Sequence, residues 1–126
     1  MNYAHGYIGH SLLAQGRTAD ALEAYRAEPE PAARLAGTAI AERRLGDTAA
    51  AEAALARLTA ELGDSALYQR AEVLTQWGRA DAAVDALERA YGAGDSGLLQ
   101  LKTDPLLDPL RALPRFKKLL QTMNFP

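Results

Sequence analysis

The sequence contains no cysteine, and this absence excludes several kinds of chemistry. Without a thiol, the chain has no disulfide framework, no thiolate nucleophile and no thiolate metal ligand. Such a composition suits a reducing compartment, so we expect a cytoplasmic protein. The sequence also lacks a run of about eighteen apolar residues and a basic start followed by an apolar stretch. We therefore expect neither a membrane span nor an export signal.

Charge of one sign is not in excess either, since the formal net charge is -2 at pH 7. This balance gives no general attraction for nucleic acid or anionic lipid, so we expect no nucleic-acid partner and no membrane partner. From Gly97 onward lysine and arginine outnumber the acidic residues. A basic terminal segment of this kind is typical of a solvated helix face.

Aromatic and β-branched residues are scarce, whereas alanine is the dominant residue, and this composition predicts an all-α fold. Gly16, Gly46 and Gly78 lie in three similar stretches: LLAQGRTADALEAY, ERRLGDTAAAEAAL and LTQWGRADAAVDAL. Each glycine is predicted to end one helix in the left-handed conformation, after which a tight turn starts a second, antiparallel helix. Thr18 and Thr48 are predicted to cap the second helices of the first two hairpins.

The pattern resembles the tetratricopeptide repeat (TPR) family, whose units are helix-turn-helix hairpins with small residues at these positions and a glycine at the turn. The resemblance implies an α-solenoid of about three hairpins in a single domain, 1–126, with repeats at about 2–31, 32–63 and 64–94 and a Pro-rich helical C-terminal cap at about 95–126. His5, Leu35 and Leu67 replace the aromatic residue usual early in each repeat. Pro29 or Pro31 is predicted to open the second repeat.

The cap contains the segment DPLLDPLRALPRF, in which Asp104 and Asp108 each precede a proline. This pairing is typical of a helix N-cap followed by the first helical residue, and Pro114 is predicted to open a final helix. The leucines and Phe116 would then cover the last hairpin, whose second helix presents Val84, Leu87 and Tyr91. The longer tail that contains this segment, LLQLKTDPLLDPLRALPRFKKLLQTM, also resembles the closing sequence of bacterial TPR regions appended to nucleotide cyclases, winged-helix regulators and kinases.

Groups that could support catalysis have simpler explanations in this sequence. Capping accounts for Asp104 and Asp108 without an acid/base role. His5 and His10 are five residues apart, so on a helix they do not share a face as metal ligands would. GAGDSG at 92–97 follows a predicted helix, where a phosphate-binding loop would follow a strand. We expect no enzyme, no cofactor and no metal.

A binding surface is predicted on the first helix of each hairpin. Residues ten, six, three and two positions before the turn glycine fall on one side of that helix. In TPR stacks this stripe lines a concave groove that binds peptides. Carried over by the resemblance, the peptide-binding residues are His10, Leu13, Ala36, Ile40, Arg43, Arg44, Tyr68, Glu72 and Gln76. Gly6 and His10 replace the residues with which some family members clamp a carboxylate, so we expect a mixed groove with an apolar floor around Leu13 and Ile40.

Two functions remain open from the sequence. The first is a non-catalytic protein–protein interaction module that binds an unknown protein, as a peptide or a helix, in the groove. The second is a structural or oligomerisation segment, which self-associates through an N-terminal hairpin exposing Tyr3, Tyr7 and Ile8 or forms the C-terminal part of a larger signalling or regulatory protein. In the second case the groove has only a structural role and binds no ligand.

Overall fold

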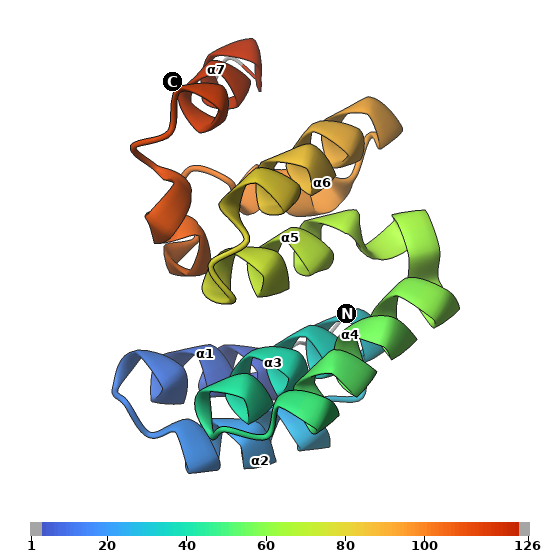
Figure 1. The fold of residues 1–126 in the computed structure, drawn as a ribbon, viewed down its shortest axis with the longest axis vertical. Helices are drawn as coiled ribbons and strands as arrows, with labels where there is room; N and C mark the ends of the chain where they lie inside the picture. The colour runs from blue at the N-terminus through green and yellow to red at the C-terminus, as the bar shows by residue number, and fades with distance from the viewer. Residues whose placement is uncertain (1–3, 124–126) are drawn as a thin grey trace. The chain divides into compact units, whose positions relative to one another are not determined.

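The structure is a computed structural model that describes residues 4–123 (Figure 1). Within those residues every regular element is helical, which confirms the predicted all-α class. The chain divides into two compact units, Met1–Ala66 and Leu67–Pro126, and each is described by itself. The single domain over 1–126 stays a prediction.

The N-terminal unit consists of two helical hairpins and a short 3₁₀ turn. Its elements are α1 (Ala4–Ala14), α2 (Thr18–Ala27), α3 (Pro31–Arg44), α4 (Thr48–Leu62) and η1 (Gly63–Ala66). Helix α1 pairs with α2 and α3 pairs with α4, while α2 and α1 both pack on α3. The first hairpin therefore stacks on the second within this unit.

The C-terminal unit contains one hairpin followed by the cap. Its elements are α5 (Leu67–Gln76), α6 (Ala80–Ala93), η2 (Ser96–Gln100), η3 (Pro105–Leu110) and α7 (Pro114–Met123), where η marks a 3₁₀ helix. The η3 segment packs on both α5 and α6, and α7 packs on α6. The cap thus covers the hairpin of its own unit (Figure 1).

All three hairpin turns have the same geometry. Gly16, Gly46 and Gly78 adopt φ angles of 79°, 91° and 79°, in the left-handed region that favours glycine. In the first turn the Arg17 N–H donates to the carbonyl of Leu12 at 2.9 Å, five residues back, and equivalent bonds close the other two turns. This is the Schellman pattern of helix termination, so the predicted glycine turns are confirmed.

The predicted N-caps are placed one residue too late. Thr18 and Thr48 are the first residues of α2 and α4, not their caps. In α4 the cap is Asp47, whose side chain accepts a hydrogen bond from the Ala50 N–H at 3.0 Å. The reason is that the Schellman turn is complete one residue after the glycine, which leaves that residue at the cap. The prediction for Pro31 is confirmed, since it opens α3.

Tyr25 holds the two hairpins of the N-terminal unit together. Its side chain is fully buried, and its hydroxyl lies 2.7 Å from Nδ1 of His10 on α1. A Cβ built on Gly9 of α1 or on Gly37 of α3 would collide with the same Cδ1–Cε1 edge of the Tyr25 ring. Both helices therefore approach the ring more closely than any larger residue permits.

A buried carboxylate connects the first hairpin to the linker that follows it. Glu28 Oε1 accepts a hydrogen bond from the Gly6 N–H in the first turn of α1 at 3.0 Å, and Oε2 accepts one from the Glu30 N–H at 2.8 Å. Arg34 donates to the Glu28 carbonyl at 3.0 Å. A negative charge at a helix N-terminus is favourable because the first N–H groups lack helical partners.

In the cap, the apolar side predicted from the sequence is largely buried. Leu107, Leu110 and Phe116 have no exposed surface. Two expectations need correction. Asp108 does not begin a helical turn of its own but lies inside η3, where its carboxylate pairs with Arg111 at 2.8 Å. Tyr91 of α6, which we expected the cap to cover, is exposed.

The glycine contact with Tyr25 gives a stability prediction. We expect Gly37→Ala to lower the free energy of unfolding by about 1–3 kcal/mol, because the new methyl overpacks the buried ring. Gly6→Ala is the matched control, since its Cβ would make only ordinary contacts, 3.5 Å from Glu28 Oε1 and 3.7 Å from Ala33 Cβ. The measurement is urea denaturation followed by circular dichroism. Equal stability of the two variants would contradict the assigned packing.

Candidate functional site

The apolar part of the predicted groove in the N-terminal unit is buried. Leu13, Ala36 and Ile40 are only 3%, 4% and 1% exposed. An apolar floor accessible to a ligand is therefore absent around Leu13 and Ile40, because burial of such side chains is worth more to the fold than their exposure. The predicted polar residues remain nearer the surface, with Arg44 exposed and Arg43 half-buried. His10 is half-buried and bonded to Tyr25, as described above.

The predicted stripe on α5 is covered by the chain's own cap. Tyr68, Glu72 and Gln76 lie one turn apart on this helix, as expected, and η3 packs along it. The Tyr68 hydroxyl donates to Asp104 Oδ2 at 2.7 Å, and Gln76 Nε2 donates to the Leu106 carbonyl at 2.7 Å. These three residues contact η3 or its N-cap Asp104, so they do not line an open groove within the unit.

Asp104 is the centre of this contact. Although the residue is only 7% exposed, every oxygen of its carboxylate and carbonyl has a partner. Besides the Tyr68 hydroxyl on Oδ2, Oδ1 accepts from the Leu106 N–H at 2.9 Å, which caps η3. The Asp104 carbonyl accepts from Arg111 Nη2 at 2.7 Å. The carboxyl of Glu72 is also hydrogen-bonded to Asp104. The sequence predicted the capping role and missed the contact with α5.

Two carboxyl groups in one buried cluster cannot both be charged at low cost. Burial raises the pKa of Glu72 well above its ordinary value, and the hydrogen bond to Asp104 and the charge of Asp104 raise it further. Glu72 therefore holds its proton to a higher pH than an exposed glutamate does. Burial, followed by the nearby Glu72 and Asp104 carboxyls, also raises the pKa of the Tyr68 phenol, which stays a donor.

The polar groups of the cluster are already used by contacts within the fold. A carboxyl pair with unequal protonation is one arrangement that general acid/base catalysis uses. Here, among residues 4–123, no buried side-chain nitrogen or oxygen lacks a hydrogen-bond partner. The donors and acceptors of Tyr68, Glu72 and Asp104 are used by one another and by η3. The chemistry of this site is therefore the attachment of the cap to α5.

Two further features are absent from the described part of the chain. It contains no group of three or more histidine, aspartate or glutamate side chains placed to bind a metal ion. None of its helices combines the length and the apolar character needed to cross a membrane.

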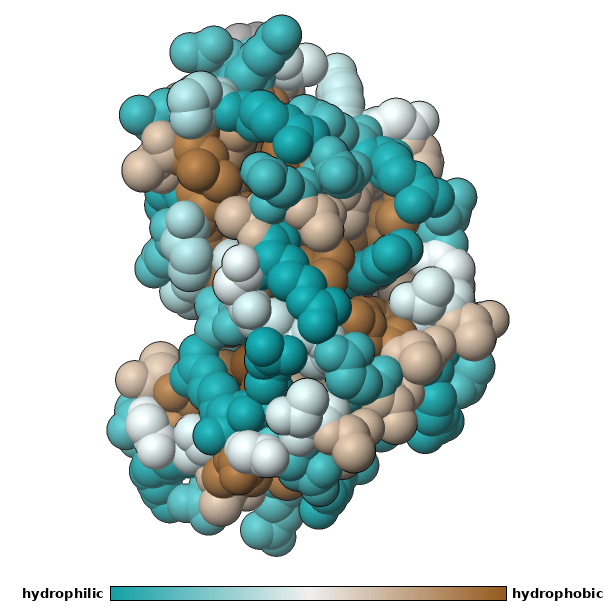
Figure 2. All heavy atoms as spheres, in the orientation of Figure 1, coloured by the Kyte–Doolittle hydropathy of each residue, from teal (hydrophilic) through white to brown (hydrophobic). Residues whose placement is uncertain are grey.

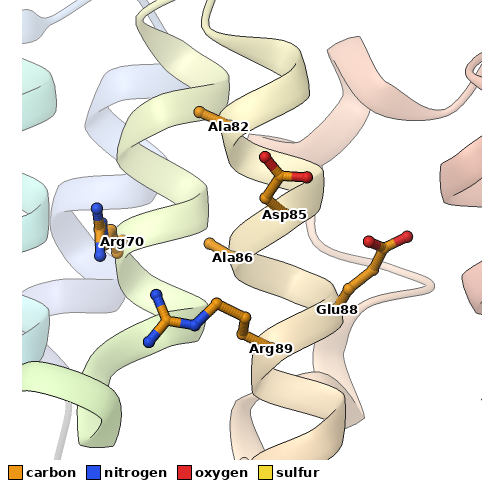
Figure 3. Close-up of a pocket in the computed structure, with 6 residues that line it drawn as sticks. All are labelled: Arg70, Ala82, Asp85, Ala86, Glu88 and Arg89. Atoms are coloured by element: carbon orange, nitrogen blue, oxygen red, sulfur yellow. The ribbon is translucent and has the colours of Figure 1, made fainter.

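A second candidate site is an open hollow on the C-terminal unit, between α5 and α6 (Figure 3). Its volume is about 640 Å³. The lining residues are Arg70 from α5 and Ala82, Asp85, Ala86, Glu88 and Arg89 from α6. Figure 2 shows charged and polar residues interspersed with apolar ones on the visible face of this unit.

The carboxylates of the hollow are held by the final helix. Arg115 of α7 lies 2.6 Å from Asp85 and 2.7 Å from Glu88. Figure 3 shows Arg89 reaching from α6 toward α5, while Glu88 points to the opposite side of α6. Sequence reasoning missed this site. In the sequence, Ala82 and Ala86 are one helical turn apart and are followed by Arg89. This pattern alone does not predict a hollow, because the hollow also depends on where α7 packs.

The comparisons with known proteins found no relative. No family model matches the chain, and no curated protein or solved structure is similar to it. Evidence on the function therefore comes from the geometry of this chain and from the resemblance seen in its sequence.

The two Asp-Pro pairs give a matched test of the cluster. We expect Asp104→Asn to lower the free energy of unfolding by about 1–3 kcal/mol, because an amide NH₂ then faces either the Leu106 N–H or the Tyr68 hydroxyl. Asp108→Asn removes only a surface ion pair, so we expect a change within about 1 kcal/mol. The single tryptophan, Trp77, lies in the C-terminal unit and reports its unfolding by fluorescence. Equal losses in the two variants would contradict the central position of Asp104.

Proposed function

We propose that the chain is a non-catalytic protein-interaction module of the TPR type, which binds a peptide or helix of a partner protein in the cytoplasm. The main support for this proposal is the burial and exposure of the side chains in the predicted stripe of the N-terminal unit. Its apolar residues are buried, whereas Arg43 and Arg44 are half-buried and exposed. A ligand on this face meets adjacent cations, so the favoured partner segment is acidic.

Several features support a module without catalysis. The three hairpins close with the same glycine turn, and two of them stack within one unit, as TPR units do. The buried carboxylates Glu28 and Asp104 are both used to hold the fold. The resemblance of the cap to the closing sequences of bacterial TPR regions favours a bacterial protein with a signalling or regulatory role.

Charge reversal at the stripe tests the proposal. We expect Arg43→Glu with Arg44→Glu to reduce recovery of a partner by roughly tenfold, because the reversed charges repel an acidic segment. Helicity and melting temperature should stay close to wild type, since these side chains are not in the core. The measurement is affinity capture of the tagged full chain with quantitative mass spectrometry.

The matched control reverses two other arginines of the same unit, Arg17 and Arg57, which form short-range surface pairs with Asp20 and Glu61. This control changes the net charge equally, and such pairs add little to stability. A partner captured equally by wild type and by the Arg43/Arg44 variant would show that the stripe assignment is wrong.

Self-association is a second candidate function, favoured by one observation on α1. Tyr7 and Ile8 are neighbours and are 58% and 51% exposed. Tyr3 lies outside the described residues. Adjacent exposed apolar side chains on one helix favour contact with a second copy of the chain. Light scattering over a concentration series distinguishes the candidates: a dimer that Tyr7→Ser with Ile8→Ser dissociates supports self-association, and a strict monomer excludes it.

A further inference from the structure

We propose that the carboxyl groups of Glu72 and Asp104 form a pH-sensitive latch, which holds the cap on α5 at acidic pH and loosens it as the pH rises. Glu72 belongs to α5, whereas Asp104 is the N-cap of η3, so the pair bridges the two parts that would separate. Opening would free Tyr68 and Gln76, which bond to the cap in the closed form. The latch lies within the C-terminal unit and does not depend on the proposed interaction function.

The two carboxyl groups are in contact inside the protein. Both residues are only 7% exposed, and the side chain of Glu72 is hydrogen-bonded to that of Asp104. An ionised carboxylate has acceptors and no donor, so a hydrogen bond between two carboxyl groups requires one proton. That proton belongs to the pair as a whole, because two strongly interacting groups titrate together.

The groups that surround the pair do not replace this proton. The Tyr68 phenol donates to Asp104 Oδ2 at 2.7 Å, and burial raises its pKa, so it does not ionise in the range where carboxyls do. Arg111 approaches from the cap and donates to the carbonyl of Asp104 at 2.7 Å. Its guanidinium also pairs with the carboxylate of Asp108 at 2.8 Å. The positive charge of Arg111 is thus shared among several acceptors.

Charged groups on the other elements packed against α5 are exposed or already bonded. Asp95, the N-cap of η2, accepts the Tyr68 N–H at 3.2 Å and the Gly97 N–H at 2.8 Å. On α5 itself, Arg70 is half-buried and lies two positions from Glu72, on a different side of the helix. Loss of the shared proton would therefore leave two negative charges in contact in a buried site. The exposed charged residues are those of α6 and the lysine before Asp104: Asp81, Asp85, Glu88, Arg89 and Lys102.

The direction of the pH effect follows from proton linkage. Burial raises the pKa of Glu72 well above its ordinary value of 4.5, and the hydrogen bond to Asp104 and the charge of Asp104 raise it further. In an open cap Glu72 is hydrated, and its pKa returns toward 4.5. The closed form therefore binds more protons from pH 4.5 up to the raised pKa. The stability that the latch gives is complete below pH 4.5 and is lost as the pH rises through the raised pKa.

The test is amide hydrogen exchange of the full chain, followed by NMR from about pH 5 to about pH 8. The Leu106 and Leu107 N–H groups report on the cap, since they donate to the carboxylate and the carbonyl of Asp104. We expect their protection factors, corrected for the intrinsic pH dependence of exchange, to fall by up to about tenfold per pH unit, the limit for one proton. The amides of α3 in the N-terminal unit are the internal reference and should change far less.

Two variants separate the latch from a purely structural contact. Glu72→Gln keeps a donor to Asp104 but cannot ionise, so we expect the protection of Leu106 and Leu107 to become nearly independent of pH. The matched control is Glu88→Gln, the same exchange on an exposed residue of α6, which should keep the pH dependence of wild type. If Glu72→Gln does not fold, Glu72→Met supplies a second side chain of similar size without an ionisable group.

Three results would overturn the latch. Constant protection of Leu106 and Leu107 in wild type would show that the closed cap holds no extra proton. An unchanged pH dependence in Glu72→Gln would assign the effect to another group. An equal loss of protection in α3 would show that the whole chain opens with rising pH, and that the pair does not act on the cap in particular.

Discussion

The carboxylate of Asp104 joins two parts of the chain that are 36 residues apart, since it accepts the Tyr68 hydroxyl of α5 while it caps η3 through the Leu106 N–H. A buried polar group is costly unless hydrogen bonds replace its hydration, and here the Tyr68 phenol and the Leu106 amide supply them. These bonds are directional, so the cap has one position on α5. The burial of Leu107, Leu110 and Phe116 stabilises that position.

This attachment decides which surfaces are open to a partner. The residues of α5 that a TPR resemblance assigns to a peptide groove are used by the cap, and the corresponding apolar residues of the N-terminal unit are buried. What remains at the surface is mostly charged. The proposed function accordingly relies on Arg43 and Arg44 of the N-terminal unit. On this proposal recognition is electrostatic, and the apolar residues serve the fold.

The sequence predicted features that arise from neighbouring residues and missed contacts between residues far apart in the chain. Gly16, Gly46 and Gly78 were predictable because a left-handed residue between two alanine-rich helices is a local requirement. The cap was predictable from its prolines and its periodic leucines. The contact of Gly37 with Tyr25 was missed, because a glycine inside a helix gives no sign of the ring that approaches it. The bond between Asp104 and Tyr68 was missed for a similar reason: no periodicity connects residues from separate elements.

The protonation state of Glu72 tests the Asp104 cluster most directly. The measurement is ¹³C NMR of the glutamate side-chain carboxyls as a function of pH, with the Glu72 resonance assigned by its loss in Glu72→Gln. If Glu72 is the buried donor to Asp104, its carboxyl stays protonated well above pH 4.5, the ordinary value of its pKa. A Glu72 carboxyl that titrates together with the exposed glutamates would contradict the cluster and the attachment of the cap that depends on it.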